Sequence, residues 1–132
     1  MTIVILYLVT TVTFFVLDAI GLRFVIKPIF DRNIGHLYAD PFRLVPAAGF
    51  YLAYVGGLLW FVSIPALRND NTVEAFMNGA ILGLLCYGTY EMTNYATLAD
   101  WSLEQVIADC IWGAVLTGTT AWIGVTATRA LT

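Results

Sequence analysis

The stretch GAILGLLCYGTYEMTNYATLADWSLEQVIADCIW, residues 79–112, decides the fold. Two long apolar runs meet in it at a short acidic turn around Asp100. Each run carries a carboxylate about two helical turns inside its apolar part, Glu91 in the first and Asp109 in the second. A carboxylate at the centre of a membrane helix costs roughly 2.5 kcal/mol or more. The stretch therefore predicts two helices that run back along each other, with a polar site near the turn that joins them.

The composition of the whole chain is that of a membrane protein. Its 132 residues are 60% hydrophobic and 11% charged, whereas a soluble domain has about 45–50% apolar and about 25% charged residues. A soluble fold of this size could not bury that much apolar surface, so we expect one integral membrane domain over residues 1–132. The formal net charge of −3 comes without any cluster of Lys or Arg, which excludes nucleic acid as a partner.

Four apolar segments are each long enough to cross a bilayer as a helix. They predict an all-α bundle of four transmembrane helices, at about residues 2–25, 45–67, 73–98 and 103–128. We expect Pro28 to end or kink the first helix and Pro65 to loosen the far end of the second. The first segment lacks the basic start of a signal peptide and is too long for one, so it is interpreted as a retained helix.

The connections between these helices differ in length and charge. Residues 30–44 form one longer polar loop between the first two helices, which we expect to lie at the membrane interface and pack back on the bundle. Ser102 is in position to cap the last helix, with Gln105 in its first turn. Small residues repeat every four positions at Gly49, Ala53 and Gly57, a spacing that lets another helix approach closely.

Basic residues indicate the orientation of the chain in the membrane. The long-loop side holds four of them and the side of the termini holds two: Arg23, Lys27, Arg32 and Arg43 against Arg68 and Arg129. Cytoplasmic loops carry the excess of Lys and Arg. The count therefore predicts a cytoplasmic long loop and periplasmic termini.

Because the helices alternate in direction, Asp18, Glu91 and Asp109 are expected near the same membrane face, the side of the long loop. Neighbouring residues extend this cluster into an acidic and aromatic pocket. The candidate ligand-binding residues are Asp18, Tyr90, Glu91, Thr93, Asn94, Asp109 and Trp112, supported by His36 and Arg43 from the loop.

Three interpretations of the acids stay open at this point. With His36 they could hold a divalent cation, since carboxylate and imidazole ligands suit such ions, although a single histidine argues against a metal site. Two of the carboxylates could instead share a proton, because neighbouring like charges repel. In the third interpretation, each acid pairs with Arg23, Arg43 or the hydrogen-bond donors of Trp and Tyr and only fixes the helix packing. No cofactor is predicted, and Cys86 and Cys110 are interpreted as packed free thiols.

These residues resemble a bacterial family of small predicted membrane proteins, catalogued as domain of unknown function 2177. The resemblance runs in order through almost the whole chain. Its matching pieces are Tyr7-Leu8, Thr11, Phe14 and Leu17-Asp18; Gly35-His36-Leu37; Ala47-Ala48, Phe50-Tyr51-Leu52, Tyr54 and Gly57; Pro65-Ala66-Leu67; Gly79 and Gly83; Tyr87-Gly88-Thr89-Tyr90-Glu91, Thr93-Asn94 and Ala96-Thr97-Leu98; Trp101; and Asp109 with Trp112-Gly113. The family has Asp where this chain has Glu91, and a Trp near Gly21 that this chain lacks.

The resemblance implies four helices, a bacterial inner-membrane location and the importance of Asp18, Glu91, Thr93, Asn94 and Asp109. It implies no activity, and links the family only to membrane-lipid modification or photo-oxidative stress.

The leading functional hypothesis is a pocket in the membrane that binds a polar headgroup or a small ligand. Its alternative is a non-catalytic accessory subunit of a larger respiratory or photosynthetic membrane complex, in which the small-residue stripes contact other subunits. A small proton-coupled transporter ranks third, because acids gathered at one membrane face do not line a path across it. No pair of nucleophile and base identifies a reaction, so enzymatic activity is left open.

Overall fold

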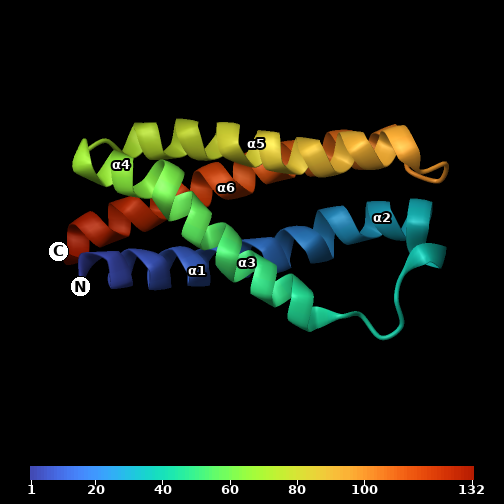
Figure 1. Ribbon diagram of the computed structural model, residues 1–132, viewed down its shortest axis with the longest axis horizontal. Helices are drawn as coiled ribbons and strands as arrows, with labels where there is room; N and C mark the ends of the chain where they lie inside the picture. The colour runs from blue at the N-terminus through green and yellow to red at the C-terminus, as the bar shows by residue number, and fades with distance from the viewer.

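The computed structural model describes all 132 residues, and it is helical without strands (Figure 1). Its helices form four rods, and the chain termini lie at the same end of the molecule (Figure 1). The first rod consists of α1 (Thr2–Gly21), η1 (Leu22–Ile26), α2 (Lys27–Ile34) and η2 (Gly35–Leu37); the second of α3 (Leu44–Leu58), η3 (Leu59–Ser63) and α4 (Ile64–Arg68); the third of α5 (Thr72–Thr97); and the fourth of α6 (Leu103–Leu131). The all-α class predicted from the sequence is confirmed.

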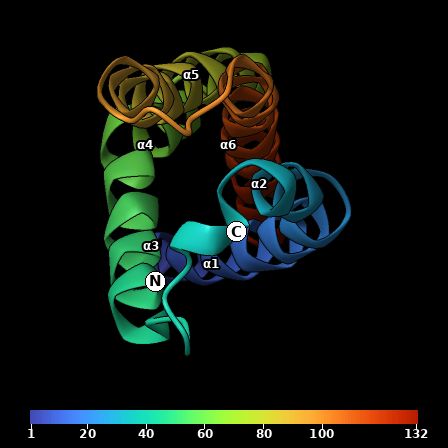
Figure 2. The same ribbon diagram turned by 90° about the vertical axis from the view of Figure 1, so that its right-hand side faces the viewer.

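Three of these rods are long and apolar enough to span a membrane, those of residues 2–37, 44–68 and 103–131. The rod that falls short is α5, because its second half contains several polar residues, Glu91 and Asn94 among them. Yet α5 lies alongside α6 for the length of the bundle (Figures 1 and 2). The molecule is therefore an integral membrane protein in which α5 contributes a more polar face to the bundle.

Pro28, predicted to end or kink the first helix, and Pro65, predicted to loosen the second, are both accommodated within helices. A π-helical turn precedes each proline, η1 before Pro28 and η3 before Pro65, and each turn ends two residues before the proline. A proline lacks an N–H and its ring collides with the carbonyl four residues earlier, so a widened turn at that point relieves the collision. The first helix consequently does not end near Val25 but continues as the polar helix α2.

The longest contact between rods is made by α5 and α6, and glycines make it possible. Gly79 and Gly83 face α6, where a side chain on Gly83 would overlap with the backbone of Gly113 and with Thr117. By contrast, Gly49 and Gly57 on α3 have nothing near them. The small residues of α5 thus serve packing inside the bundle, whereas those of α3 face outward.

Two buried clusters hold the rods together. The larger lies toward the end with the termini and includes Leu6, Phe14, Leu58, Leu116 and Val125. The smaller joins Ile34 of α2 to Trp101 and Val106 at the start of α6. The start of α6 also carries the predicted cap, in which Ser102 and Gln105 bond to each other's backbone N–H.

The first half of the loop segment packs back on the bundle as helix α2. Phe30 meets Trp101 edge-on with ring centroids 5.5 Å apart. Arg32 donates a hydrogen bond to Glu104 at 2.9 Å. These contacts tie the end of the first rod to the α5–α6 turn, while α3 crosses the bundle obliquely (Figure 1). The space between the oblique helix and the other rods holds the candidate site.

Candidate functional site

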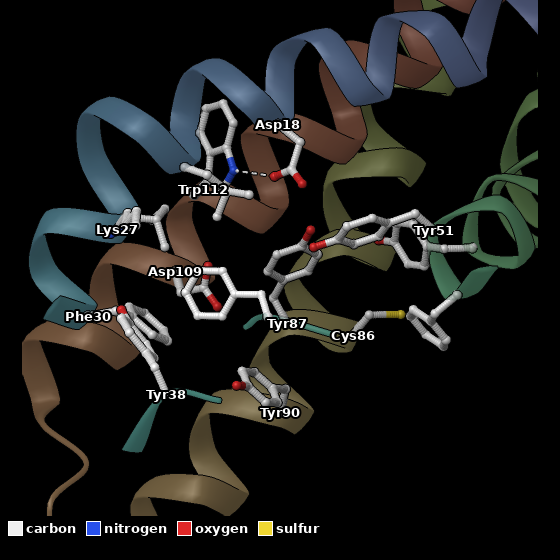
Figure 3. Close-up of a pocket in the computed structure, with 15 residues that line it drawn as sticks. Asp18, Lys27, Phe30, Tyr38, Tyr51, Cys86, Tyr87, Tyr90, Asp109 and Trp112 are labelled. Atoms are coloured by element: carbon white, nitrogen blue, oxygen red, sulfur yellow. Dashed lines mark hydrogen bonds between the residues drawn. The ribbon is translucent and has the colours of Figure 1, made fainter. Parts of the chain in front are cut away.

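A cavity of about 600 Å³ lies between the four rods, on the side of the long loop (Figure 3). Its volume falls within the roughly 300–1,000 Å³ typical of small-molecule sites. Twelve of its 15 lining residues are apolar or aromatic, and the other three are charged. The lining residues are Asp18, Leu22, Ile26, Lys27, Phe30, Tyr38, Phe42, Phe50, Tyr51, Tyr54, Cys86, Tyr87, Tyr90, Asp109 and Trp112.

Two buried carboxylates, those of Asp18 and Asp109, form the polar part of the wall (Figure 3). Asp18 is 4% exposed and accepts a hydrogen bond at 3.3 Å from the indole N–H of Trp112. Asp109 is 7% exposed, and its side-chain neighbour is another acid, Glu91. Neither forms a salt bridge, since the salt bridges of this protein join other residues. Both carboxylates are therefore available to a ligand in the cavity.

Aromatic rings from α3 and α5 form the opposite wall. Tyr54 bonds through its hydroxyl to that of Thr117 on α6 at 2.9 Å. Its ring lies 6.4 Å from the ring of Tyr87, measured between centroids. The ring of Tyr87 in turn packs directly on Gly113, where any side chain would overlap with it. These contacts fix the rings, so the wall is formed before any ligand arrives.

The cavity reaches the surface of the bundle between α3 and α5. Three residues line the cavity and are also exposed at the surface: Phe50 of α3, and Cys86 and Tyr90 of α5. In a membrane-spanning bundle this opening faces the hydrocarbon chains of the lipids.

A second border of the cavity lies toward the long loop and is more polar. Lys27 lines it, and its ammonium bonds to both carboxylate oxygens of Asp31, at 3.0 and 3.2 Å. Burial raises the pKa of the Tyr38 hydroxyl above its ordinary value, and the nearby Asp31 raises it further, so Tyr38 stays neutral. The positive charge at this border is already compensated within the protein.

Glu91 is placed behind the cavity and not on its wall. Its side chain is fully buried, and its Oε1 accepts a hydrogen bond of 2.9 Å from the indole of Trp101. Its Oε2 has no hydrogen-bond partner. The carboxyl group of Asp109 lies close enough to interact with it electrostatically. Glu91 therefore adjoins the site through Asp109.

Four other predicted site residues do not line the cavity. Thr93 is exposed on α5, and its hydroxyl bonds to carbonyls of its own helix. Asn94 lies one turn beyond Tyr90, past the end of the cavity. His36 is exposed and bonds to Asp100 at 2.7 Å. Arg43 is exposed on the loop.

The metal interpretation finds no support in this arrangement. No three side chains of His, Cys, Asp or Glu come together closely enough to hold a metal ion. Glu91 turns to Trp101 and His36 to Asp100, so Asp18 and Asp109 are left without the further ligands that a divalent cation requires.

Sequence reasoning missed part of the cavity wall, notably Lys27, Tyr51 and Tyr54. The signal was present in the segment FYLAY, residues 50–54, which concentrates aromatic residues in the first half of an apolar helix. The small residues beside it, Gly49 and Gly57, predict only the close approach of another helix. Asp18, Asp109, Tyr90 and Trp112, which were predicted as site residues, do lie on the wall.

The fold and the cavity define the class of the protein: an all-α integral membrane protein with a polar site inside its helical bundle. The chain belongs to the family of predicted membrane proteins DUF2177, whose sequence profile matches residues 3–126. The match includes every residue that lines the cavity. No curated protein and no solved structure matches the chain.

Proposed function

We propose that this protein binds an amphipathic ligand in the plane of the membrane. The polar head of the ligand occupies the cavity beside Asp18 and Asp109, and its apolar part extends between α3 and α5 into the bilayer. One observation supports this above all others: two buried carboxylates without basic partners face an aromatic cavity that opens on the surface of the bundle.

The energetics of the acids favour a ligand over a purely structural role. A buried charge is strongly disfavoured unless it is paired and hydrogen-bonded. Asp18 accepts one long hydrogen bond with the Tyr51 hydroxyl nearby, and Asp109 adjoins another acid, Glu91, so no basic group of the protein compensates either acid. The interpretation in which Arg23 or Arg43 neutralises these acids finds no matching salt bridge. A bound polar head would supply the missing contacts.

The proposed placement in the membrane requires α5 to cross it as a fourth span. Helix α4 ends at the same end of the bundle as the termini, whereas α6 begins at the end of the long loop (Figure 1). If the other three rods cross the membrane, α5 must cross it as well, because it connects the end of α4 on one side to the start of α6 on the other. The excess of basic residues on the long-loop side supports a cytoplasmic loop and periplasmic termini in a bacterial inner membrane.

Native mass spectrometry of protein extracted gently from its own membranes tests the proposal. The wild type should carry a bound mass, and Asp109→Asn should lose it. The matched control is Asp70→Asn, which alters an exposed carboxylate at the opposite end of the bundle. A wild type without bound mass, or equal retention in both variants, would contradict the proposal.

One observation favours the alternative of a non-catalytic accessory subunit. Gly49 and Gly57 of α3 are close-packing residues with nothing against them in the isolated chain. A helix of another subunit could lie on this face. Recovery of the protein mainly in a larger assembly, and its release from that assembly by Gly49→Leu, would support this function. A proton-coupled transporter would need titratable groups beyond these acids, and the buried polar residues toward the termini are threonines and a serine: Thr10, Ser63, Thr117, Thr120 and Thr128.

A further inference from the structure

We infer that the group bound beside Asp18 and Asp109 is an organic cation, a primary or quaternary ammonium carried by an amphiphile. The inference rests on the proposed function and names its ligand class. It is drawn from the distribution of charge around the cavity and from the chemistry of the cavity wall.

The salt bridges of the protein join exposed groups and include neither Asp18 nor Asp109. Salt bridges connect Lys27 to Asp31, Arg32 to Glu104, His36 to Asp100 and Arg129 to Asp70, and all of these groups are exposed. Asp18 and Asp109 have no such partner. Of the basic residues only Lys27 lines the cavity, and Asp31 already occupies its ammonium. The charge that is missing from the inner cavity is positive.

The size of the cavity and the kind of side chains around it favour an organic cation over a metal ion. A volume of about 600 Å³ far exceeds that of a coordinated ion, and no cluster of metal ligands is present. The rings of Tyr51, Tyr87 and Trp112 line the same space (Figure 3). Aromatic faces attract ammonium groups, above all where water is excluded. The combination of aromatic rings and carboxylates is suited to recognising an ammonium.

The apolar opening indicates that this cation carries a hydrocarbon part. Phe50, Cys86 and Tyr90 border the cavity where it reaches the surface of the bundle. A small hydrophilic cation would find no polar contacts along this route. An alkyl chain would remain in the bilayer while the ammonium reaches the acids. The apolar opening and the buried acids of the site therefore fit a single amphiphilic molecule.

Binding in dodecyl maltoside micelles, a neutral host, tests the inference. The fluorescence of Trp112 reports on the cavity in a variant in which Trp60, Trp101 and Trp122 are all Phe, with helicity used to confirm that it stays folded without the Trp101 bond. Dodecyltrimethylammonium should bind about tenfold or more tightly than dodecyl sulfate. Asp109→Asn should reduce the binding of the cation about tenfold, which corresponds to the loss of about 1.4 kcal/mol. The control Asp70→Asn should bind it as the wild type does. Native mass spectrometry of the unaltered chain provides the same comparison without tryptophan changes.

Two further probes distinguish the sources of the ammonium. Binding of an ethanolamine phospholipid in preference to a glycerol phospholipid would identify a lipid headgroup as the source. Binding of tetramethylammonium alone would identify a free cation, and would show that the hydrocarbon part of the proposed function is not needed.

The failure of this inference can be told apart from failure of the proposed function. If dodecyl sulfate binds as well as the cation, and Cys86→Trp at the cavity opening blocks both, the cavity binds amphiphiles without selecting a cation and the inference is overturned. If Cys86→Trp leaves every probe bound, the amphiphiles bind elsewhere and the proposed function fails as well.

Discussion

The indole N–H of Trp101 donates a hydrogen bond of 2.9 Å to the carboxylate of Glu91, ten residues earlier on the other side of the α5–α6 turn. Both side chains are buried, and Trp101 also packs edge-on against Phe30 of α2 and Tyr90 of α5. One side chain thus links the turn, the first rod and Glu91, a predicted site residue. This bond ties Glu91 of α5 to the turn beneath the cavity.

Replacing Trp101 by Phe should destabilise the protein by about 1–3 kcal/mol, because the buried carboxylate of Glu91 loses its hydrogen-bond donor. The free energy of unfolding can be measured from helicity in mixed micelles of increasing sodium dodecyl sulfate. Trp60→Phe is the matched control, since Trp60 is 73% exposed and its loss should change little.

Glu91→Gln should cost less than Trp101→Phe, because the amide oxygen still accepts the indole bond and no charge remains buried. Equal losses for Trp101→Phe and Trp60→Phe would show that the bond between Trp101 and Glu91 contributes nothing to stability.

Gly83→Ala should separate α5 from α6. A side chain at Gly83 overlaps with the backbone of Gly113 and with Thr117, and backbone cannot move aside as a flexible side chain can. Overpacking of this kind typically costs about 1–3 kcal/mol. Gly88→Ala, one turn further along α5, has nothing within 4 Å and should be neutral or slightly stabilising. The same unfolding measurement compares the two, and a stable Gly83→Ala variant would rule out the close contact.

The fold was predictable from the sequence where hydropathy alone determines it. Runs of about 20 apolar residues define transmembrane helices. Because successive helices alternate in direction, Asp18 and Asp109 come to a similar depth in the membrane. The continuation of the first helix was not predictable. Pro28 has the usual features of a helix end, and only the widened turn η1 before it allows the helix to go on as α2.

The candidate site was predictable in part for a similar reason. Neighbours in sequence on a helix point in different directions, about 100° apart per residue, so Tyr90 reaches the cavity while Glu91 turns away from it. Thr93 was assigned to the site by sequence proximity, and its hydroxyl bonds to its own helix instead. The contribution of Tyr51 depends on the oblique course of α3, which no local pattern indicates.

Single cysteines should show that α5 crosses the membrane. In a chain whose Cys86 and Cys110 have been changed to Ala, a cysteine at Asn71 should react with an impermeant maleimide added from the periplasmic side, as should one at Thr132. A cysteine at Asp100 should react with the same maleimide only after the membrane is permeabilised. Reaction of residues 71 and 100 from the same side would mean that α5 does not span the bilayer, and a reversed pattern at all three positions would invert the orientation.

Gly21→Ala should weaken ligand retention by displacing Trp112. The indole ring of Trp112 fills the space beside Gly21, and a Cβ there would overlap with the ring. Moving the ring breaks the hydrogen bond that its N–H donates to Asp18 and disturbs the aromatic wall of the cavity. The expected loss is about tenfold in affinity for dodecyltrimethylammonium, since one hydrogen bond to a charged group contributes roughly 1.5–3 kcal/mol. Gly56→Ala, on a surface with nothing near it, is the control. Trp112→Phe, followed by native mass spectrometry because the fluorescent indole is gone, separates the two effects: it removes the N–H and keeps an aromatic ring. If Trp112→Phe binds like the wild type while Gly21→Ala does not, the ring and not its hydrogen bond to Asp18 recognises the ligand.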